Sequence, residues 1–176
     1  MIKIASIVFV GFLMILNSCN KVLNSDNNGH TYYVNSQTGD DNFSGNSPEQ
    51  AWKTLQRLEK QKFHAGDIVS LSSENPFRES LILSNLEGSN ELPIVFTSYG
   101  SSDAVIESGD SIAILANNCK YLKIKNIQET GSGRLKGNKT NGIELLHCQN
   151  SEIDSVEASG YLYSGIRITG GSNIRI

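Results

Sequence analysis

Apolar and polar residues alternate along the last third of the chain, and the alternating pattern repeats. Residues 142–145 read Gly-Ile-Glu-Leu, and residues 165–168, 23 positions later, read Gly-Ile-Arg-Ile. Residues 150–153 and 173–176 match at the same spacing. A period of two puts the apolar side chains on one face of a strand. Short strands that repeat every roughly 20 to 50 residues, with polar turns between them, predict the stacked coils of a parallel β-helix.

Charged residues give an independent check of this alignment. Residues 114–127 fit the same frame at a spacing of 29 residues. Stacked strands lie about 4.8 Å apart, and opposite charges on them stabilise each pair by roughly 0.2 to 1 kcal/mol. Every charged pair in the alignment has opposite signs: Lys123 with Glu152, Glu152 with Arg175, Glu144 with Arg167, and Lys125 with Asp154. The inward columns are aliphatic, with Ile124, Ile153 and Ile176 in one and Ile143 and Ile166 in another.

Two of the three cysteines, Cys119 and Cys148, occupy matching positions in adjacent coils of this alignment. Stacked strands would hold their Cα atoms within the roughly 4.4 to 6.8 Å that a disulfide tolerates. Two interpretations stay open: a disulfide, or two small buried thiols at equivalent turn positions. The chain has no CxxC or His-rich spacing, so the sequence indicates no metal site.

The first residues have the pattern of an export signal. Lys3 precedes an apolar run over residues 4–16, which is short for a membrane span. Leu16, Ser18 and Cys19 resemble a bacterial lipobox, in which cleavage before the cysteine frees its thiol for a lipid. Plain secretion with cleavage nearby, or a retained anchor, is the alternative. We expect residues 1–18 to be a signal peptide, Cys19 to be lipidated, and residues 19–30 to be a polar tether to the membrane.

The charge of the chain disfavours nucleic acid as a partner. The formal net charge is −3, and it becomes −4 without residues 1–18, because that segment contains Lys3 and no acidic residue. Proteins that bind a phosphate backbone usually present a basic surface.

A helix is predicted ahead of the coils. Ser47 suits an N-cap and Pro48 suits the first helical position. One apolar face would then be formed by Ala51, Trp52, Leu55 and Leu58. This helix would cover the edge of the first coil, and we expect Trp52 to be buried there rather than to stack on a sugar. The chain therefore divides into residues 31–66, a strand with a capping helix, and residues 67–176, the first coils.

Several short motifs follow one another from Tyr32 onward. They are Tyr32-Tyr33-Val34 with Gly39 and Asp41, Ser47-Pro48, Ala51-Trp52-Lys53-Thr54-Leu55, Gly66-Asp67-Ile68-Val69, Pro93-Ile94-Val95-Phe96 and Ser98-Tyr99-Gly100. Together they resemble the amino-terminal part of exported bacterial proteins of the pectate-lyase-like superfamily. The resemblance implies an all-β fold, a right-handed parallel β-helix, at the outer membrane or cell surface of a Gram-negative bacterium. It also implies a polysaccharide partner and Ca²⁺ as a cofactor that such proteins can use.

Candidate site residues are few. The loop over residues 131–140 carries the basic residues Arg134, Lys136 and Lys139, which would attract an acidic glycan if the loop forms a groove wall; a solvated glycine-rich loop is the alternative. Glu152 and Asp154 would lie near 7 Å apart, a separation that suits an inverting glycosidase. Their matched cations favour a surface charge ladder instead. An Asp-Asp-Asn turn at residues 40–42 fits bonding to its own backbone better than binding of Ca²⁺.

The superfamily contains polysaccharide lyases, glycoside hydrolases and proteins without a known reaction. We expect a lyase that cleaves uronate-containing glycan by β-elimination, ahead of a glycoside hydrolase and of a non-catalytic glycan-binding or adhesive protein. Catalytic residues of such proteins usually lie in the middle coils, and this chain stops at Ile176 inside a copy of its repeat. The sequence therefore predicts that the carboxy-terminal coils are missing, that the catalytic residues lie beyond Ile176, and that residues 31–176 alone associate and are inactive.

Overall fold

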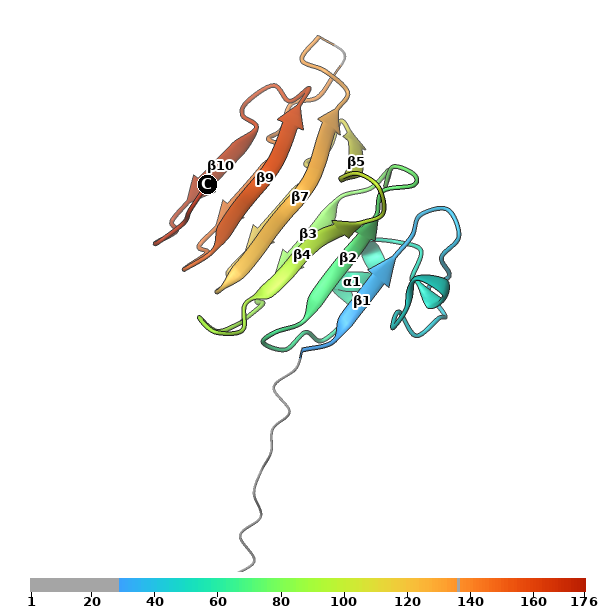
Figure 1. Cartoon of the computed structure of the whole chain (residues 1–176). Coiled ribbons are helices and arrows are strands. Elements are labelled where there is room, and N and C mark those ends of the chain that lie inside the picture. The colour runs from blue at the N-terminus through green and yellow to red at the C-terminus, as the bar shows by residue number, and fades with distance from the viewer. Residues whose placement is uncertain (1–28, 136) are drawn as a thin grey trace, which may run out of the picture.

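A computed structural model describes residues 29–135 and 137–176 (Figure 1). The predicted signal peptide, Cys19, residues 20–28 of the tether and Lys136 lie outside the described residues. The strands are β1 (Thr31–Val34), β2 (Ile68–Ser72), β3 (Leu81–Ser84), β4 (Ile94–Tyr99), β5 (Ala104–Gly109), β6 (Ile114–Asn117), β7 (Leu122–Gly131), β8 (Ile143–Leu146), β9 (Glu152–Ser159) and β10 (Ile166–Thr169). The helical elements are a 3₁₀ turn, η1 (Pro48–Gln50), and α1 (Gln56–Glu59). Neither of these described helices is long and apolar enough to cross a membrane.

The strands form two sheets whose ladders are parallel. The six-stranded sheet has the order β1-β2-β4-β7-β5, with β9 paired to β7, and the four-stranded sheet has the order β10-β8-β6-β3. Parallel neighbours cannot be joined by a tight turn, so from β2 onward the chain visits the other sheet before it returns beside an earlier strand. The fold is therefore mostly β, with parallel strands and very little helix, in a β-helix-like arrangement (Figure 1).

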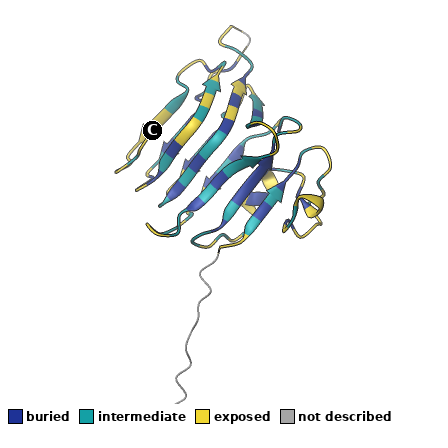
Figure 2. Cartoon of the chain, viewed as in Figure 1, coloured by how far each residue is buried: buried dark blue, intermediate teal, exposed yellow. Residues whose placement is uncertain are grey.

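The register of the strands confirms the alignment made from the repeat. The opposing residues are Lys123 and Glu152, Lys125 and Asp154, Glu144 and Arg167, and Ile143 and Ile166, with Glu152 bridged in turn to Arg175. Ile124 and Ile153 face each other and are buried, and buried residues alternate with less buried ones along β7 (Figure 2). Ile176, which the sequence predicts to face inward, is instead 70% exposed. Period-two alternation thus placed the aliphatic residues of β7, β8 and β9 correctly.

Residues with a positive φ recur at equivalent turns. Asn85, Asn118 and His147 follow β3, β6 and β8, and their φ values are 56°, 54° and 52°. The Asn118 side-chain amide donates to Asn85 Oδ1 over 2.7 Å, which links two coils. Asn tolerates this left-handed conformation because its short polar side chain bonds locally. The turns therefore stack as regularly as the strands.

The two longest strands each bend near the middle, a feature that the sequence alignment did not predict. Asn126 in β7 has a φ of 56° and Ser155 in β9 has a φ of 52°. Before the bend β7 pairs with β4, and after it β7 pairs with β5. A single strand thus forms part of two faces of the coil.

The prediction of one continuous capping helix is wrong. After η1 the backbone at Ala51 is extended, with φ −63° and ψ 144°, and Trp52 forms a parallel bridge with Val34 of β1. The Trp52 amide donates to Tyr33 O, and its carbonyl accepts from the Asn35 amide, so backbone groups at the edge of β1 are paired. A helix would have left these edge groups open. The four residues of the predicted apolar face are nevertheless buried, namely Ala51, Trp52, Leu55 and Leu58, and α1 contacts β3.

Candidate functional site

A groove with a volume of about 390 Å³ lies on the outer side of β6, β8 and β10; we refer to it as the Tyr163 groove. Its lining residues are Ile112, Leu115, Lys139, Thr140, Asn141, Glu144, Leu146, Tyr163 and Arg167. Leu115, Glu144 and Arg167 occupy one register position on three neighbouring strands. The residues before them on β6 and β8, Ile114 and Ile143, are buried, so alternation directs this column outward.

The polar side of the groove is held in place by a small network. Arg167 Nε lies 3.5 Å from Glu144 Oε1, and the Asn141 amide donates to Glu144 Oε2 over 3.3 Å. Ser164 Oγ donates to Asn141 Oδ1 over 2.7 Å, which connects the segment before β8 to the one before β10. Both oxygens of the Glu144 carboxylate therefore have partners, and the carboxylate has a fixed position.

The apolar side of the groove combines an aromatic ring with aliphatic side chains. Tyr163 is 65% exposed, and its amide donates to Thr140 O over 3.2 Å, which fixes the backbone of this residue. Ile112, Leu115 and Leu146 are half-buried around the same groove. Small-molecule sites typically combine apolar and aromatic walls with a few convergent polar groups. A sugar offers the matching surface, because its C–H face is apolar while its hydroxyls seek carboxylate and amide partners.

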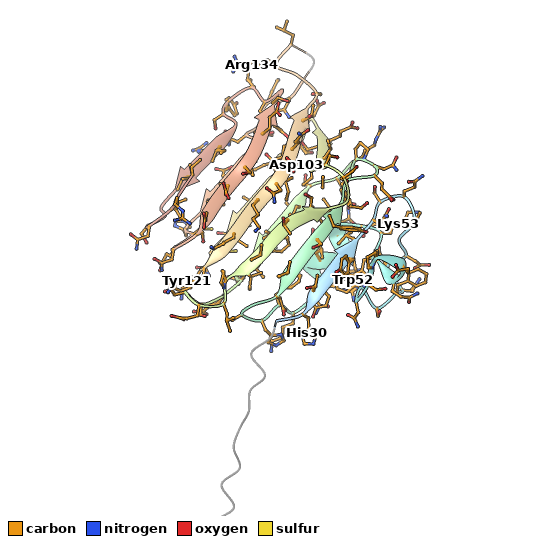
Figure 3. The ribbon with its side chains drawn as sticks, viewed as in Figure 1. His30, Trp52, Lys53, Asp103, Tyr121 and Arg134 are labelled. Atoms are coloured by element: carbon orange, nitrogen blue, oxygen red, sulfur yellow. The ribbon has the colours of Figure 1, made fainter. Side chains whose placement is uncertain are left out.

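The basic loop predicted from the sequence is divided by the structure. Arg134 lies in the loop that follows β7 (Figure 3), and its Nε donates to the Tyr161 carbonyl over 3.1 Å. Lys139 instead lines the Tyr163 groove. Lys136 is outside the described residues, and its neighbour Leu135 is fully exposed. Of the two described cations, Lys139 reaches the groove, whereas the Arg134 guanidinium ties its own loop to the next coil.

The cysteines Cys119 and Cys148 are buried and are present as free thiols. Each thiol donates to backbone carbonyls, Cys119 to Asn117 O over 3.5 Å and Cys148 to Ala116 O over 3.4 Å. Of the two arrangements left open by the sequence, the structure shows buried thiols in stacked turns, and the disulfide stays a prediction.

Glu129 is a buried acid that the sequence reasoning missed. It lies in β7 between Ile106 of β5 and Ala158 of β9, and neither carboxyl oxygen has a hydrogen-bond partner among the described residues. Burial raises the pKa of Glu129 to about 9, since a charge would be poorly solvated there. The alternation of the strand could have predicted this burial. Ile127 faces inward, and a period of two places residue 129 on the same inward face.

The carboxylate pair considered for an inverting glycosidase belongs to the surface. Glu152 lies 3.1 Å from Lys123 Nζ and is also paired with Arg175. Hydrogen bonds from Arg175 and from Lys123 lower the pKa of Glu152, which disfavours a role as general acid. Asp41, from the Asp-Asp-Asn turn, accepts hydrogen bonds from the Lys53 and Thr54 amides and from the Thr54 hydroxyl, so its oxygens serve the local backbone.

Known proteins with a similar sequence or fold include glycan-acting enzymes. No family model matches the chain. A lacto-N-biosidase of Bifidobacterium longum subsp. longum is 32% identical over 78 residues, a match that covers 43% of this chain and 5% of that relative. The crystal structure of a GH136 lacto-N-biosidase from Eubacterium ramulus aligns with a TM-score of 0.62 and 24% identity, over 81% of this chain and 30% of that one.

Two further solved structures match. The native form of the Eubacterium ramulus enzyme aligns with a TM-score of 0.59 and 22% identity. A rhamnogalacturonan lyase aligns more weakly, with a TM-score of 0.49 and 15% identity. At these identities the likeness to the Eubacterium ramulus structures shows the fold, and the chain spans less than a third of their length.

Proposed function

We propose that this chain forms the amino-terminal coils of an exported, right-handed parallel β-helix protein that hydrolyses glycosidic bonds in extracellular glycan. The observation that carries the glycan-binding part of the proposal is the Tyr163 groove, which joins the exposed Tyr163 ring to the anchored Glu144 carboxylate of β8 and the Asn141 amide. The similarity in sequence and in fold to lacto-N-biosidases supports hydrolysis as the reaction.

The expected preference for a lyase finds no support in these relatives, and hydrolysis replaces it as the first candidate. Elimination needs a positive charge at the substrate carboxylate. In the described part of the groove, Arg167 is engaged by Glu144, which leaves Lys139 as the cation without an ion pair. Among its described residues, the groove therefore offers a uronate carboxylate one free cation, Lys139, and the preference for hydrolysis rests on the similarity to the lacto-N-biosidase.

The groove contributes binding rather than bond cleavage. Glu144 is the single carboxylate among the described lining residues. An inverting or retaining glycoside hydrolase needs two carboxylates. Its fixed oxygens would accept hydrogen bonds from sugar hydroxyls while the Tyr163 ring contacts the C–H face. A purely glycan-binding protein is the second candidate, and this same shortage of carboxylates favours it.

The proposed location rests on the sequence of the first 30 residues. Residues 1–18 would direct export, Cys19 would carry the lipid, and the polar segment that follows would hold the coils away from the membrane. The expected setting is the surface of a Gram-negative bacterium, where a glycan substrate is accessible.

Glycan binding and product analysis on the full-length protein test the proposal. Tyr163→Ala should weaken binding to a neutral oligosaccharide on the order of tenfold, while Tyr163→Phe, which keeps the ring, should change it little. Hydrolysis releases a new reducing end without an unsaturated sugar, and elimination releases an unsaturated uronate. Unsaturated products would show that the protein is a lyase. Glycan binding that is unchanged by Tyr163→Ala would show that the groove does not bind the glycan. Binding without cleavage would favour the second candidate.

A further inference from the structure

The two buried cysteines lie in a turn that repeats from coil to coil. Lys120 is bridged to Gln149, and the Gln149 amide donates to the Cys119 carbonyl over 2.9 Å. Cys119 and Cys148 precede these bridged residues, so they occupy the same position in adjacent coils. Both are fully buried in the core. Stacked backbones about 4.8 Å apart fall within the Cα separation of roughly 4.4 to 6.8 Å that a disulfide requires.

The Cys148 sulfur points along the stack toward the coil that holds Cys119, and Cys119 Sγ in turn donates to Leu83 O, 3.9 Å away in the coil before it. Cys148 Sγ donates to Ala116 O over 3.4 Å, and Ala116 lies three residues before Cys119 in the preceding coil. Cys119 Sγ is hydrogen-bonded with Cys148, which raises the pKa of Cys119 and lowers the pKa of Cys148 to about 7. The two sulfurs are therefore close enough in the folded chain to interact directly.

We propose that Cys119 and Cys148 form a disulfide that links the two coils on either side of the loop at residues 131–140. That loop contains Lys139 of the Tyr163 groove. The bond would join the two ends of the chain segment that carries this loop. Exposure to oxidants in the cell rests on the proposed export, but the chemistry is independent of glycan binding.

Formation of the bond requires a disulfide as oxidant, either a protein disulfide in the exporting compartment or oxidised glutathione in solution. The Cys148 thiolate attacks this disulfide, forms a mixed disulfide and releases one reduced thiol. The Cys119 sulfur, as its thiolate, then attacks Cys148 Sγ and releases the second thiol. The protein loses two electrons and two protons, and the oxidant disulfide gains them. Because both sulfurs are buried in the folded chain, exchange takes place before the coils close.

The test uses the full chain with Cys19→Ser, so that Cys119 and Cys148 are the thiols that remain. The protein is refolded with a mixture of reduced and oxidised glutathione, denatured without reductant, and treated with an alkylating reagent. We expect a peptide that joins the two cysteines, an intact mass lower by two hydrogens, and no alkylation in the main species. Two alkylated cysteines in the main species would overturn the proposal.

Thermal unfolding gives a second readout. A reductant should lower the melting temperature of the oxidised Cys19→Ser protein by several degrees, because the bond restricts the unfolded chain. Adding Cys119→Ser or Cys148→Ser should remove this sensitivity to reductant. If those variants do not fold, the peptide map of the Cys19→Ser protein still shows whether the disulfide forms, because it is made on a protein that keeps both cysteines.

Discussion

Lys123 and Glu152 lie directly opposite each other on β7 and β9, and their side chains form an ion pair with an Nζ–Oε2 distance of 3.1 Å. Arg175 pairs with the other carboxylate oxygen from the next coil. Glu152 thus stands between two cations along the stacking direction. The column ties three successive coils together on the surface of the six-stranded sheet.

Reversing the charge in this column should destabilise the protein. Glu152→Lys would place three positive charges in line, and we expect a loss of about 1 kcal/mol in the free energy of unfolding. Chemical denaturation measures it, and the loss should shrink at high salt. Glu157→Lys is the matched control, because Glu157 faces the neutral Gln128 on β7. Equal effects of the two substitutions would show that the cations do not stabilise Glu152.

The stability of the protein should depend on pH through Glu129. Its pKa is raised to about 9 in the folded chain, against about 4.3 in an unfolded chain, so the folded state holds the proton more tightly. This contribution is fully present below pH of about 4.3 and is lost as the pH rises toward 9, at up to about 1.4 kcal/mol per pH unit. Glu129→Gln should therefore gain stability relative to the wild type between pH of about 5 and 8.

Urea denaturation at several pH values checks this expectation. Glu157→Gln removes a carboxylate from the exposed side of β9 and should leave the pH dependence unchanged. Parallel pH profiles for the wild type and Glu129→Gln would mean that Glu129 is ionised and solvated in the folded protein.

Close packing between coils should make Gly142 intolerant of a side chain. A Cβ at this position would lie 2.6 Å from Gly165 O and 3.0 Å from the Tyr161 ring. We expect Gly142→Ala to lower the free energy of unfolding by about 1 to 3 kcal/mol through overpacking. Gly165→Ala is the control, because its nearest neighbour, Ala158 Cβ, lies at 3.3 Å. A Gly142→Ala protein as stable as the Gly165→Ala protein would show that the coils can move apart at low cost.

Lipidation predicts a clear phenotype for Cys19. Cys19→Ser should fail to incorporate radioactive palmitate in bacteria and should leave the membrane fraction, since its thiol is the proposed attachment point. Cys148→Ser, which changes a buried thiol of the core, should label normally. Unchanged labelling of Cys19→Ser would refute the anchor.

The sequence predicted parallel stacking and its register, because these depend on short-range rules that repeat. The alternation at residues 143–145 and 166–168 fixed which side chains face inward, and the charges of Lys123, Glu152 and Arg175 agreed with the resulting alignment. Burial of Trp52 was also correct. Its local apolar pattern indicated what would be buried without indicating in which backbone conformation.

The tertiary structure decided the features that depend on neighbours distant in the sequence. Pairing of Trp52 with Val34 overrode a good helical pattern, because the open edge of β1 offered backbone hydrogen bonds that a helix could not satisfy. The Tyr163 groove required three coils to bring Leu115, Glu144 and Arg167 onto one surface. Glu129 is shielded from solvent because β5 and β9 pair with β7 on either side. A repeated pattern fixes the direction of a side chain, but its solvation and its partners exist only once the coils have stacked.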